Sequence, residues 1–289
     1  MSKPFFTGCC TALVTPFLGQ KVNYPMLEQL LQKQMQAGLD AALVCGTTGE
    51  APTLTDEEKL EIIRRAKAYV GDQMQIIAGT GSNDTAHTVA LSKAAAEAGA
   101  DALLVVSPYY NKATPDGLVY HYMSIAHAVS IPVILYNVPA RTGVDIPVSV
   151  YRRLSAIQNI VGVKEASNDI GKILRILAGC PKEFAVWTGN DDQTVPAIAL
   201  GASGVISVVG NVCPEKMQDM AMAALDGDFD TAAFLQRQLL PLTEALFREV
   251  NPIPVKAAMK CIGYDCGTCR LPLVDAAKET CDQLRQILT

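Results

Sequence analysis

The sequence predicts a (β/α)8 barrel, and three features lead to this prediction: short apolar runs, amphipathic segments between them, and a recurring phrase that joins a helix end to a strand. The runs are almost continuously apolar, as the buried strands of a parallel sheet are. Eight units of strand and helix close such a barrel. A doubly wound open sheet is the alternative, but no G-x-G-x-x-G motif follows the first run.

The expected strands are spaced regularly through the N-terminal and central parts of the chain. They occupy residues 9–16, 41–46, 75–81, 102–108, 132–139, 159–167, 184–191 and 204–211. The phrases QAGLDAALV, EAGADALLV and ALGASGVIS each consist of a helix end, a glycine and a strand. Glycine is the usual left-handed stop of a helix, so one structural unit is repeated along the chain.

Helical spacing is present between the strands. Asn23 is the expected cap of the first helix, whose apolar residues recur on one face. Thr55 and Glu58 form a capping-box pattern at the start of the second helix, and the third is expected to begin at Asn83. The apolar face of the first helix consists of Leu27, Leu30, Leu31 and Met35.

The C-terminal part of the chain follows a different pattern, which is purely helical from about residue 225 through Thr289. We therefore expect a catalytic barrel over residues 1–225 and a helical extension over residues 226–289 that packs on it. Barrels of this type typically take ~250 residues as one domain. The 49% of hydrophobic residues supply enough apolar surface for a large core.

Charge and hydropathy exclude several classes of function. The net charge is −5, and Lys and Arg are scattered singly or in pairs, which argues against a nucleic-acid partner. No apolar stretch approaches the ~20 residues needed to cross a bilayer. The first residues also lack the apolar region of a signal peptide. The expectation is a cytoplasmic protein with no membrane partner.

The nine cysteines raise the question of a metal site. Cys9, Cys45 and Cys213 lie in apolar contexts that are typical of small core residues. A C-terminal set has the spacing C-x4-C-x2-C of one iron–sulfur class, but its first member lies in an amphipathic helical pattern. A zinc site would need a second CxxC pair, so reduced thiols are expected. The C-terminal set is Cys261, Cys266 and Cys269, with Cys281 beyond.

Lys164 is the strongest catalytic candidate. The active site of such a barrel lies at the C-terminal ends of its strands, and Lys164 stands there directly after an apolar run. Burial favours the neutral amine of a lysine, which can attack a ketone to form an imine. The alternative is a strand-end lysine that reaches solvent or pairs with Glu165.

Other strand-end residues could share this chemistry. Tyr136 and Tyr110 could relay protons during imine formation, although tyrosines on strands more often belong to the core. Thr47 and Thr48, between two glycines, could hold a carboxylate or simply form a tight turn. Arg141 could form a forked contact with a carboxylate, or it could be an exposed loop residue.

A metal site or a histidine-based site is not expected. Asp191 and Asp192 have no histidine or third carboxylate near them in sequence, and they fit the first turn of the following helix. The histidines all fall in helical segments, and they are His87, His121 and His127.

Six segments at the expected strand ends occur in the order found in one enzyme family. They are GTTGE (46–50), SPYYNK (107–112), YNVPARTG (136–143), VGVKEAS (161–167), TGND (188–191) and GVISV (204–208). Together they resemble the dihydrodipicolinate synthases, which belong to the pyruvate-dependent lyases together with N-acetylneuraminate lyase. The resemblance covers nearly the whole chain, and six segments in register make it specific.

The resemblance implies a catalytic set. Lys164 would form an imine with pyruvate, and Tyr136 would shuttle protons, linked through Thr48 to Tyr110. In this family the tyrosine that matches Tyr110 reaches across a dimer interface into the neighbouring subunit's site. At least a dimer is therefore implied, and family members are commonly homotetramers built from dimers.

The resemblance also implies how the substrates bind. Thr47 and Thr48 would hold the carboxylate of pyruvate, while Gly189 and Ile206 would line the pocket with their backbones. Arg141 would hold the carboxylate of aspartate semialdehyde. The ARTG pattern, and GTTGE rather than GSTGE, favour the synthases over the sialic-acid lyases. No metal or organic cofactor is implied.

Many of these synthases are inhibited by lysine in a cleft at the dimer interface. The matching positions here are Ala51, Asp56, Asn83, His87 and Tyr109. Lysine-sensitive members typically have a glutamate where this chain has His87, and a histidine where it has Asp56. Without the glutamate, the α-ammonium of lysine loses a charge-assisted hydrogen bond. Weak or absent inhibition by lysine is therefore expected.

The resemblance implies condensation of pyruvate with aspartate semialdehyde to give 4-hydroxy-tetrahydrodipicolinate, a step of lysine and diaminopimelate biosynthesis. Three alternatives stay open. One is a lyase or aldolase for a sugar-derived 2-oxo acid, and another is a barrel that binds a 2-oxo acid without turnover. The third, a phosphate-substrate isomerase, would need a glycine-rich phosphate loop, of which Gly210-Asn211 is only a faint version.

Overall fold

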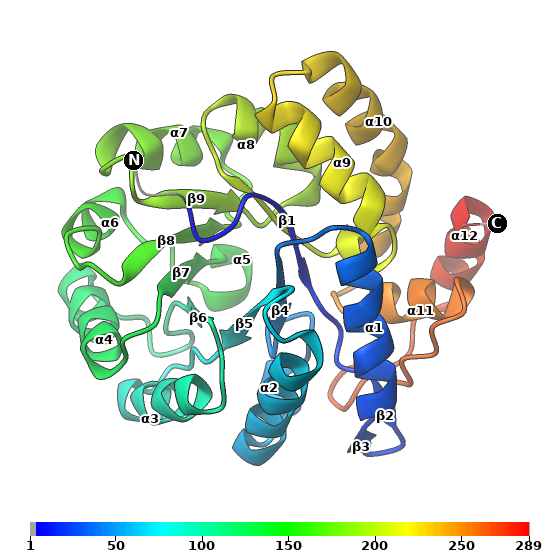
Figure 1. The fold of residues 1–289 in the computed structure, drawn as a ribbon, viewed down its shortest axis with the longest axis horizontal. Coiled ribbons are helices and arrows are strands. Elements are labelled where there is room, and N and C mark those ends of the chain that lie inside the picture. Colours follow the sequence, from blue (N-terminus) through cyan, green and yellow to red (C-terminus); the bar gives the residue numbers. More distant parts are fainter. Residues whose placement is uncertain (1–3, 289) are drawn as a thin grey trace.

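The computed structural model describes residues 4–288, and it contains a closed barrel of parallel strands in the order β1-β10-β9-β8-β7-β6-β5-β4 (Figure 1). Each barrel strand overlaps one of the predicted segments, so the (β/α)8 prediction is confirmed and the open sheet is excluded. The barrel strands are β1 (Gly8–Ala12), β4 (Ala41–Val44), β5 (Gln75–Gly79), β6 (Ala102–Val106), β7 (Val133–Asn137), β8 (Ile160–Glu165), β9 (Ala185–Thr188) and β10 (Gly204–Ser207).

Helices surround the barrel and connect its strands, as Figure 1 shows. They are α1 (Tyr24–Gln36), α2 (Asp56–Val70), α3 (Thr85–Glu97), α4 (Pro115–Ala128), α5 (Pro139–Thr142), α6 (Val148–Leu154), α7 (Ile170–Gly179), α8 (Thr194–Ala199) and α9 (Pro214–Leu225). Short 3-10 helices add η1 (Ala51–Thr53), η2 (Asp191–Gln193) and η3 (Val209–Asn211).

The local sequence explains where the helices begin. The Asn23 side chain accepts a hydrogen bond of 3.3 Å from a backbone N–H in the first turn of α1. Thr55 and Glu58 form both bonds of a capping box at α2. Both predicted caps are confirmed. The prediction for α3 is wrong by two residues, because the helix begins at Thr85, and the Asp84 side chain accepts from the N–H groups of its first turn.

The repeated glycines stop helices as predicted. Gly38, Gly99 and Gly201 have φ angles of 73°, 100° and 110°, in the region that favours glycine. In each case a barrel strand begins three residues later, so the glycine turns the chain from the outer layer back into the barrel.

The chain before β1 closes the N-terminal end of the barrel. Phe6 stacks on Trp187 with ring centroids 4.8 Å apart, and the indole N–H of Trp187 donates to the Phe6 carbonyl at 3.2 Å. Both residues belong to the apolar cluster inside the barrel, which also contains Tyr136 and Ile206. A separate, larger cluster lies between the strands and the helices.

A small hairpin follows β1 and was not predicted. Its strands, β2 (Phe17–Leu18) and β3 (Lys21–Val22), pair antiparallel and contain two residues each. Strands this short have no room for a detectable apolar pattern.

The proposed boundary after residue 225 falls at the end of α9, and the extension contains α10 (Phe229–Leu246), α11 (Ile253–Cys261) and α12 (Lys278–Leu288). The prediction that it is purely helical is wrong for residues 262–277. Gly263 and Gly267 have positive φ angles, and Pro272 lacks the N–H that a helix needs.

The non-helical stretch, orange in Figure 1, passes beside the hairpin of β2 and β3, where the Phe17 N–H donates to the Cys266 carbonyl at 2.9 Å. Residues 1–3 of the expected barrel segment and Thr289 of the expected extension lie outside the described residues.

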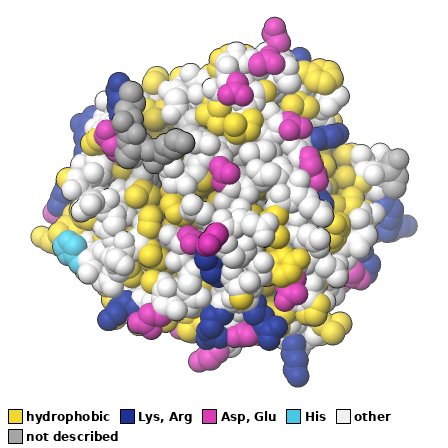
Figure 2. All heavy atoms as spheres, viewed as in Figure 1, with side chains coloured by type: hydrophobic (Ala, Val, Ile, Leu, Met, Phe, Trp, Pro, Cys, Tyr) yellow, Lys and Arg dark blue, Asp and Glu magenta, His cyan; other side chains and the backbone are white. Residues whose placement is uncertain are grey.

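Charged side chains of both signs are interspersed on the face shown in Figure 2. Within residues 4–288, no helix is both long enough and apolar enough to cross a membrane.

Candidate active site

A cavity of ≈ 780 Å³ opens at the C-terminal ends of the strands. Its wall is completed by residues of the C-terminal extension, from Leu240 to Asn251. The structure brings six predicted residues together here: Thr47, Thr48, Tyr136, Arg141, Lys164 and Gly189.

Lys164 lies on β8 with 5% of its surface exposed. Its Nζ atom lies 4.7 Å from the centroid of the Tyr136 ring, and the two residues are direct partners in the register of β7 and β8. Among the described residues, none forms a hydrogen bond or ion pair with this amine. Lys164 is therefore a buried amine beside a phenol, in a cavity that a ketone can enter.

Pairing between Lys164 and Glu165 does not occur. Successive side chains of a strand point to opposite faces, so Glu165 points away from the barrel interior. There its carboxylate accepts from Asn137 Nδ2 at 2.8 Å and from the Tyr151 hydroxyl at 3.2 Å, and it lies 3.9 Å from Lys172 Nζ. Burial raises the pKa of the Glu165 carboxyl, while Lys172 and Asn137 oppose the rise.

Gly189 makes room for the Lys164 side chain. A Cβ atom at Gly189 would lie 2.8 Å from Lys164 Cε and 2.7 Å from Ala166 Cβ, both too close for carbon atoms. A larger residue at this position would displace the amine from its place beside Tyr136.

The turn between Gly46 and Gly49 presents Thr47 and Thr48 to the cavity. The Gly49 N–H donates to the Gly46 carbonyl at 3.1 Å, which closes the turn. The Thr48 hydroxyl accepts a hydrogen bond of 2.9 Å from Asn251 Nδ2. Thr48 is buried, whereas Thr47 is partly open to the cavity.

Asn251 is a site residue that the sequence did not reveal. It lies between α10 and α11, and its carbonyl accepts from Arg141 Nη2 at 3.0 Å, so it links Arg141 to Thr48. Arg141 itself is exposed on the short helix α5, and it lines the cavity. The Asn-Pro pair at 251–252 indicates a turn, but nothing local in it points to an active site.

Two predicted residues do not line the cavity. Ile206 is fully buried on β10, inside the barrel. Tyr110 is 90% exposed, has a left-handed φ of 70°, and lines neither of the two cavities described here. On its own chain, Tyr110 therefore does not join Tyr136 and Thr48 in the wall of the cavity.

Two ionisable groups whose electrostatics involve Lys164, Asp191 and Cys10, were not predicted to surround its amine. Asp191 begins η2, as its predicted place in a first helical turn requires, and its buried carboxylate accepts from the Ser207 hydroxyl and the N–H groups of Val208 (3.0 Å) and Val209 (3.3 Å). Burial raises its pKa despite these bonds and the charge of Lys164.

Cys10, on β1, is fully buried inside the barrel. Burial raises the pKa of its thiol to about 12, with the charge of Lys164 opposing. The thiol is therefore a neutral group of the barrel interior at neutral pH.

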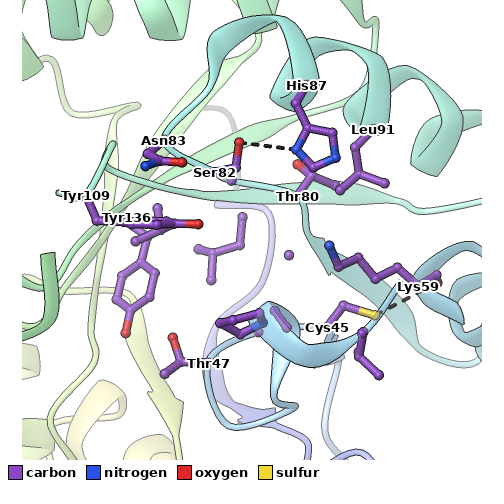
Figure 3. Close-up of a pocket in the computed structure, with 18 of the residues that line it drawn as sticks. Cys45, Thr47, Lys59, Thr80, Ser82, Asn83, His87, Leu91, Tyr109 and Tyr136 are labelled. Carbon is purple, nitrogen blue, oxygen red and sulfur yellow. Dashed lines mark hydrogen bonds between the residues drawn. The ribbon is translucent and has the colours of Figure 1, made fainter. Parts of the chain in front are cut away.

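A second cavity of ≈ 620 Å³ adjoins the first and shares Thr47, Tyr136, Val138 and Arg141 with it. In Figure 3, Tyr136 and Thr47 lie on one side of this cavity and Lys59 and His87 on the other. All residues of the predicted lysine cleft line it, namely Ala51, Asp56, Asn83, His87 and Tyr109.

Three ionisable groups of this cleft, Asp56, Lys59 and His87, are paired with one another. His87 Nε2 lies 2.7 Å from Asp56 Oδ2, and Lys59 Nζ lies 3.2 Å from Asp56 Oδ1. Burial tends to raise the pKa of the Asp56 carboxyl, but hydrogen bonds from His87 and Lys59 hold it below its ordinary value. His87 Nδ1 also lies 3.4 Å from the Ser82 hydroxyl, as the dashed line in Figure 3 marks.

Cysteines and acidic residues do not converge elsewhere. In the part of the chain that the structure describes, no three His, Cys, Asp or Glu side chains are grouped to hold a metal ion. Cys9 and Cys45 are buried as expected, and Cys213 is half-buried. Cys266 is buried in the non-helical stretch, while Cys261, Cys269 and Cys281 are half-buried.

Comparison with known proteins agrees with this geometry. A family model described as the dihydrodipicolinate synthetase family matches residues 5–289. A 4-hydroxy-tetrahydrodipicolinate synthase from Acetivibrio thermocellus is 48% identical over 289 residues, covering 100% of this chain and 98% of the relative.

Solved structures of such synthases share the fold. The crystal structure of dihydrodipicolinate synthase from Aquifex aeolicus superposes with a TM-score of 0.96 at 43% identity, covering 98% of this chain and 97% of that one. The enzyme from Cyanidioschyzon merolae, solved with lysine bound, gives 0.96 at 38% identity, covering 99% and 98%. The chain belongs to the dihydrodipicolinate synthetase family.

Proposed function

We propose that this chain condenses pyruvate with aspartate semialdehyde to 4-hydroxy-tetrahydrodipicolinate, through an imine on Lys164. The observation that carries the proposal is the buried, unpaired amine of Lys164 next to the Tyr136 ring. The cavity also offers two places for carboxylates, at the Thr47–Thr48 turn and at Arg141. The names of the relatives, at 43–48% identity over most or all of the chain, support the same reaction.

The reaction begins when the neutral amine of Lys164 attacks the ketone carbon of pyruvate. The carbinolamine loses water and leaves a protonated imine, whose nitrogen accepts electrons from the adjacent carbon. Proton transfers in these steps pass through the Tyr136 hydroxyl, which lies on the neighbouring strand. Thr47 and Thr48 hold the pyruvate carboxylate by hydrogen bonds.

Loss of a methyl proton then gives an enamine, whose carbon adds to the aldehyde of aspartate semialdehyde. Arg141 holds the carboxylate of this second substrate in a forked contact. The substrate's own amine attacks the imine carbon, closes the ring and displaces the Lys164 amine. One water leaves in total, and the electron count does not change, so the protein's own side chains suffice for each step.

Assembly is part of this proposal. Tyr110 lies outside its own chain's cavities, so a second subunit is needed if it is to extend the relay from Tyr136 and Thr48. We propose a homotetramer built from dimers in which each subunit lends Tyr110 to its neighbour. A cytoplasmic location fits an enzyme that acts on small metabolites of amino-acid biosynthesis.

Trapping the imine tests the proposal. The protein is incubated with pyruvate and borohydride, and its intact mass and labelled peptide are measured. We expect one reduced pyruvate per chain, on Lys164, and none on Lys164→Ala. Lys59→Ala is the matched control, because Lys59 lines the adjoining cleft and should leave labelling unchanged. Labelling that persists in Lys164→Ala would refute the assignment of the nucleophile.

A further inference from the structure

The C-terminal extension contacts the Thr47–Thr48 turn from outside the barrel. We infer that the buried ion pair of Glu50 and Lys256, together with the backbone N–H of Arg270, positions this turn to bind the carboxylate of pyruvate; these groups are here called the Glu50 clasp. The inference rests on the proposed function of the turn. It assigns a role in substrate binding to residues that do not touch the substrate.

Glu50 is the link between the clasp and the turn. Its backbone N–H donates to the Thr47 carbonyl at 3.1 Å, and its side chain is almost completely buried. Its φ angle is 58°, a left-handed conformation that residues other than glycine rarely adopt. Such a conformation persists only where the surroundings hold it in place.

Lys256 supplies the buried counter-charge. Its Nζ atom lies 2.5 Å from Glu50 Oε1, with 4% and 1% of the two side chains exposed. The same ammonium donates to the Thr268 carbonyl at 3.2 Å and lies 4.3 Å from the centroid of the Phe17 ring. Lys256 stands on α11, five residues after Asn251, which itself bonds Thr48.

Arg270 completes the clasp from the non-helical stretch. Its backbone N–H donates to Glu50 Oε2 at 2.8 Å, and its guanidinium donates to the Thr53 carbonyl at 2.8 Å. The guanidinium also forms a forked contact with Glu58, at 2.7 and 2.6 Å. Both carboxylate oxygens of Glu50 therefore have partners from the extension.

Positioning of the Thr47–Thr48 turn explains the buried ion pair of the clasp better than a gain in folding stability does. Burying two charges costs desolvation energy that their attraction only partly offsets, so an apolar pair of the same size would often be as stable. The ion pair instead fixes the direction of the Glu50 side chain, and through it the Thr47 carbonyl and the turn. Small displacements of a substrate-positioning group can cost ~10²-fold in rate or binding.

Two variants test the inference. Glu50→Gln keeps the size and one of the two acceptor oxygens but removes the charge, and Glu50→Gln/Lys256→Met removes both charges together. The control is Lys67→Met/Asp101→Asn, which removes a partly buried ion pair of 2.9 Å at the N-terminal end of the strands. Each protein is measured for thermal unfolding, for kcat and KM, and for the pyruvate concentration that gives half-maximal borohydride labelling.

We expect both clasp variants to raise the KM of pyruvate and the half-labelling concentration about tenfold or more, with a smaller change in kcat. The control should lower the unfolding temperature without moving either pyruvate value. If the clasp variants unfold at lower temperature while both pyruvate values stay within about twofold of wild type, the clasp is only structural and the inference is wrong.

Wild-type behaviour separates this inference from the proposed function. If the wild-type protein fails to form the pyruvate imine, the proposed function fails. If the double variant does not fold, Glu50→Gln alone decides, because it keeps the size of the side chain and one of the two oxygens that accept from Lys256 and from the Arg270 N–H.

Discussion

The catalytic cavity and the adjoining cleft share part of their walls, including Thr47 and Tyr136, yet their charges are arranged differently. In the catalytic cavity, the Lys164 amine has no ion-pair partner among the described residues and lies against an aromatic ring. In the cleft, Asp56 is bonded to both His87 and Lys59.

In the proposed mechanism, this difference separates a reactive site from one that binds a ligand without reacting. An amine must be unpaired to attack a ketone, because an ion pair would keep it protonated. A cleft whose carboxylate is already paired must break an internal contact before that carboxylate can bind a new cation. A ligand of the cleft therefore pays a cost that pyruvate, approaching Lys164, does not.

Substituting Tyr136, which lies beside Lys164, and Tyr109, which lines only the cleft, should give the largest contrast. Tyr136→Phe removes the hydroxyl proposed to relay protons, and we expect kcat to fall by ~10²–10⁴-fold. Tyr109→Phe removes a hydroxyl from the cleft and should leave kcat near the wild-type value. Steady-state kinetics of both variants measure the contrast, and equal losses would show that the cavities do not divide the work in this way.

Arg141 lies in the wall that both cavities share, so its loss shows which one it serves. Arg141→Ala should lower kcat/KM for aspartate semialdehyde by about ten- to a hundredfold, since a charge-assisted contact contributes ~1.5–3 kcal/mol. Imine trapping with pyruvate should stay near normal. If wild type cleaves N-acetylneuraminate and ignores aspartate semialdehyde, the lyase alternative is correct instead.

Lysine tests whether the internal pairing weakens the cleft. For wild type we expect half-inhibition by lysine above ~1 mM, or none, at sub-saturating pyruvate. His87→Glu should remove the contact with Asp56 and supply a carboxylate for the α-ammonium of lysine. Inhibition should therefore strengthen by about tenfold or more. His87→Gln is the control. Strong inhibition of wild type would show that the paired charges are no obstacle.

Mixed oligomers give the smallest expected effect, a partial recovery of activity. Tyr110→Phe and Lys164→Ala subunits are each defective in the proposed mechanism. Co-assembled by refolding or co-expression, they form one site with an intact Lys164 and a borrowed Tyr110. Random pairing should restore about a quarter of wild-type activity. A mixture no better than either parent would mean that each subunit works alone.

The barrel could be predicted because its strands are buried on both faces and its helices end at glycines. Both signals are local, so the sequence carries them directly. The two-residue strands at Phe17 and Lys21 carry no such signal, and the helical expectation failed at residues 262–277. That stretch is held by contacts to Phe17 and Glu50, which lie far away in sequence.

The same division applies to the site: residues on or next to strands could be predicted, and residues placed by long-range contacts could not. Lys164 and Tyr136 lie at the ends of strands and Thr48 follows one, and the topology of the barrel brings the ends of its strands together. Asn251 was missed because it follows a helix of the extension, and its place beside Thr48 depends on how that extension docks. Tyr110 could be named only through the family resemblance, since its own chain leaves it exposed.

The stacking of Phe6 on Trp187 has an optical consequence. Trp187 is the only tryptophan in the sequence, it is fully buried, and it is the register partner of Lys164 on the adjacent strand. Its fluorescence therefore comes from a single place, the dry interior of the barrel. Detachment of the segment before β1 would expose the indole and shift its emission to longer wavelength. The intrinsic fluorescence of Trp187 therefore indicates whether this segment still covers the end of the barrel.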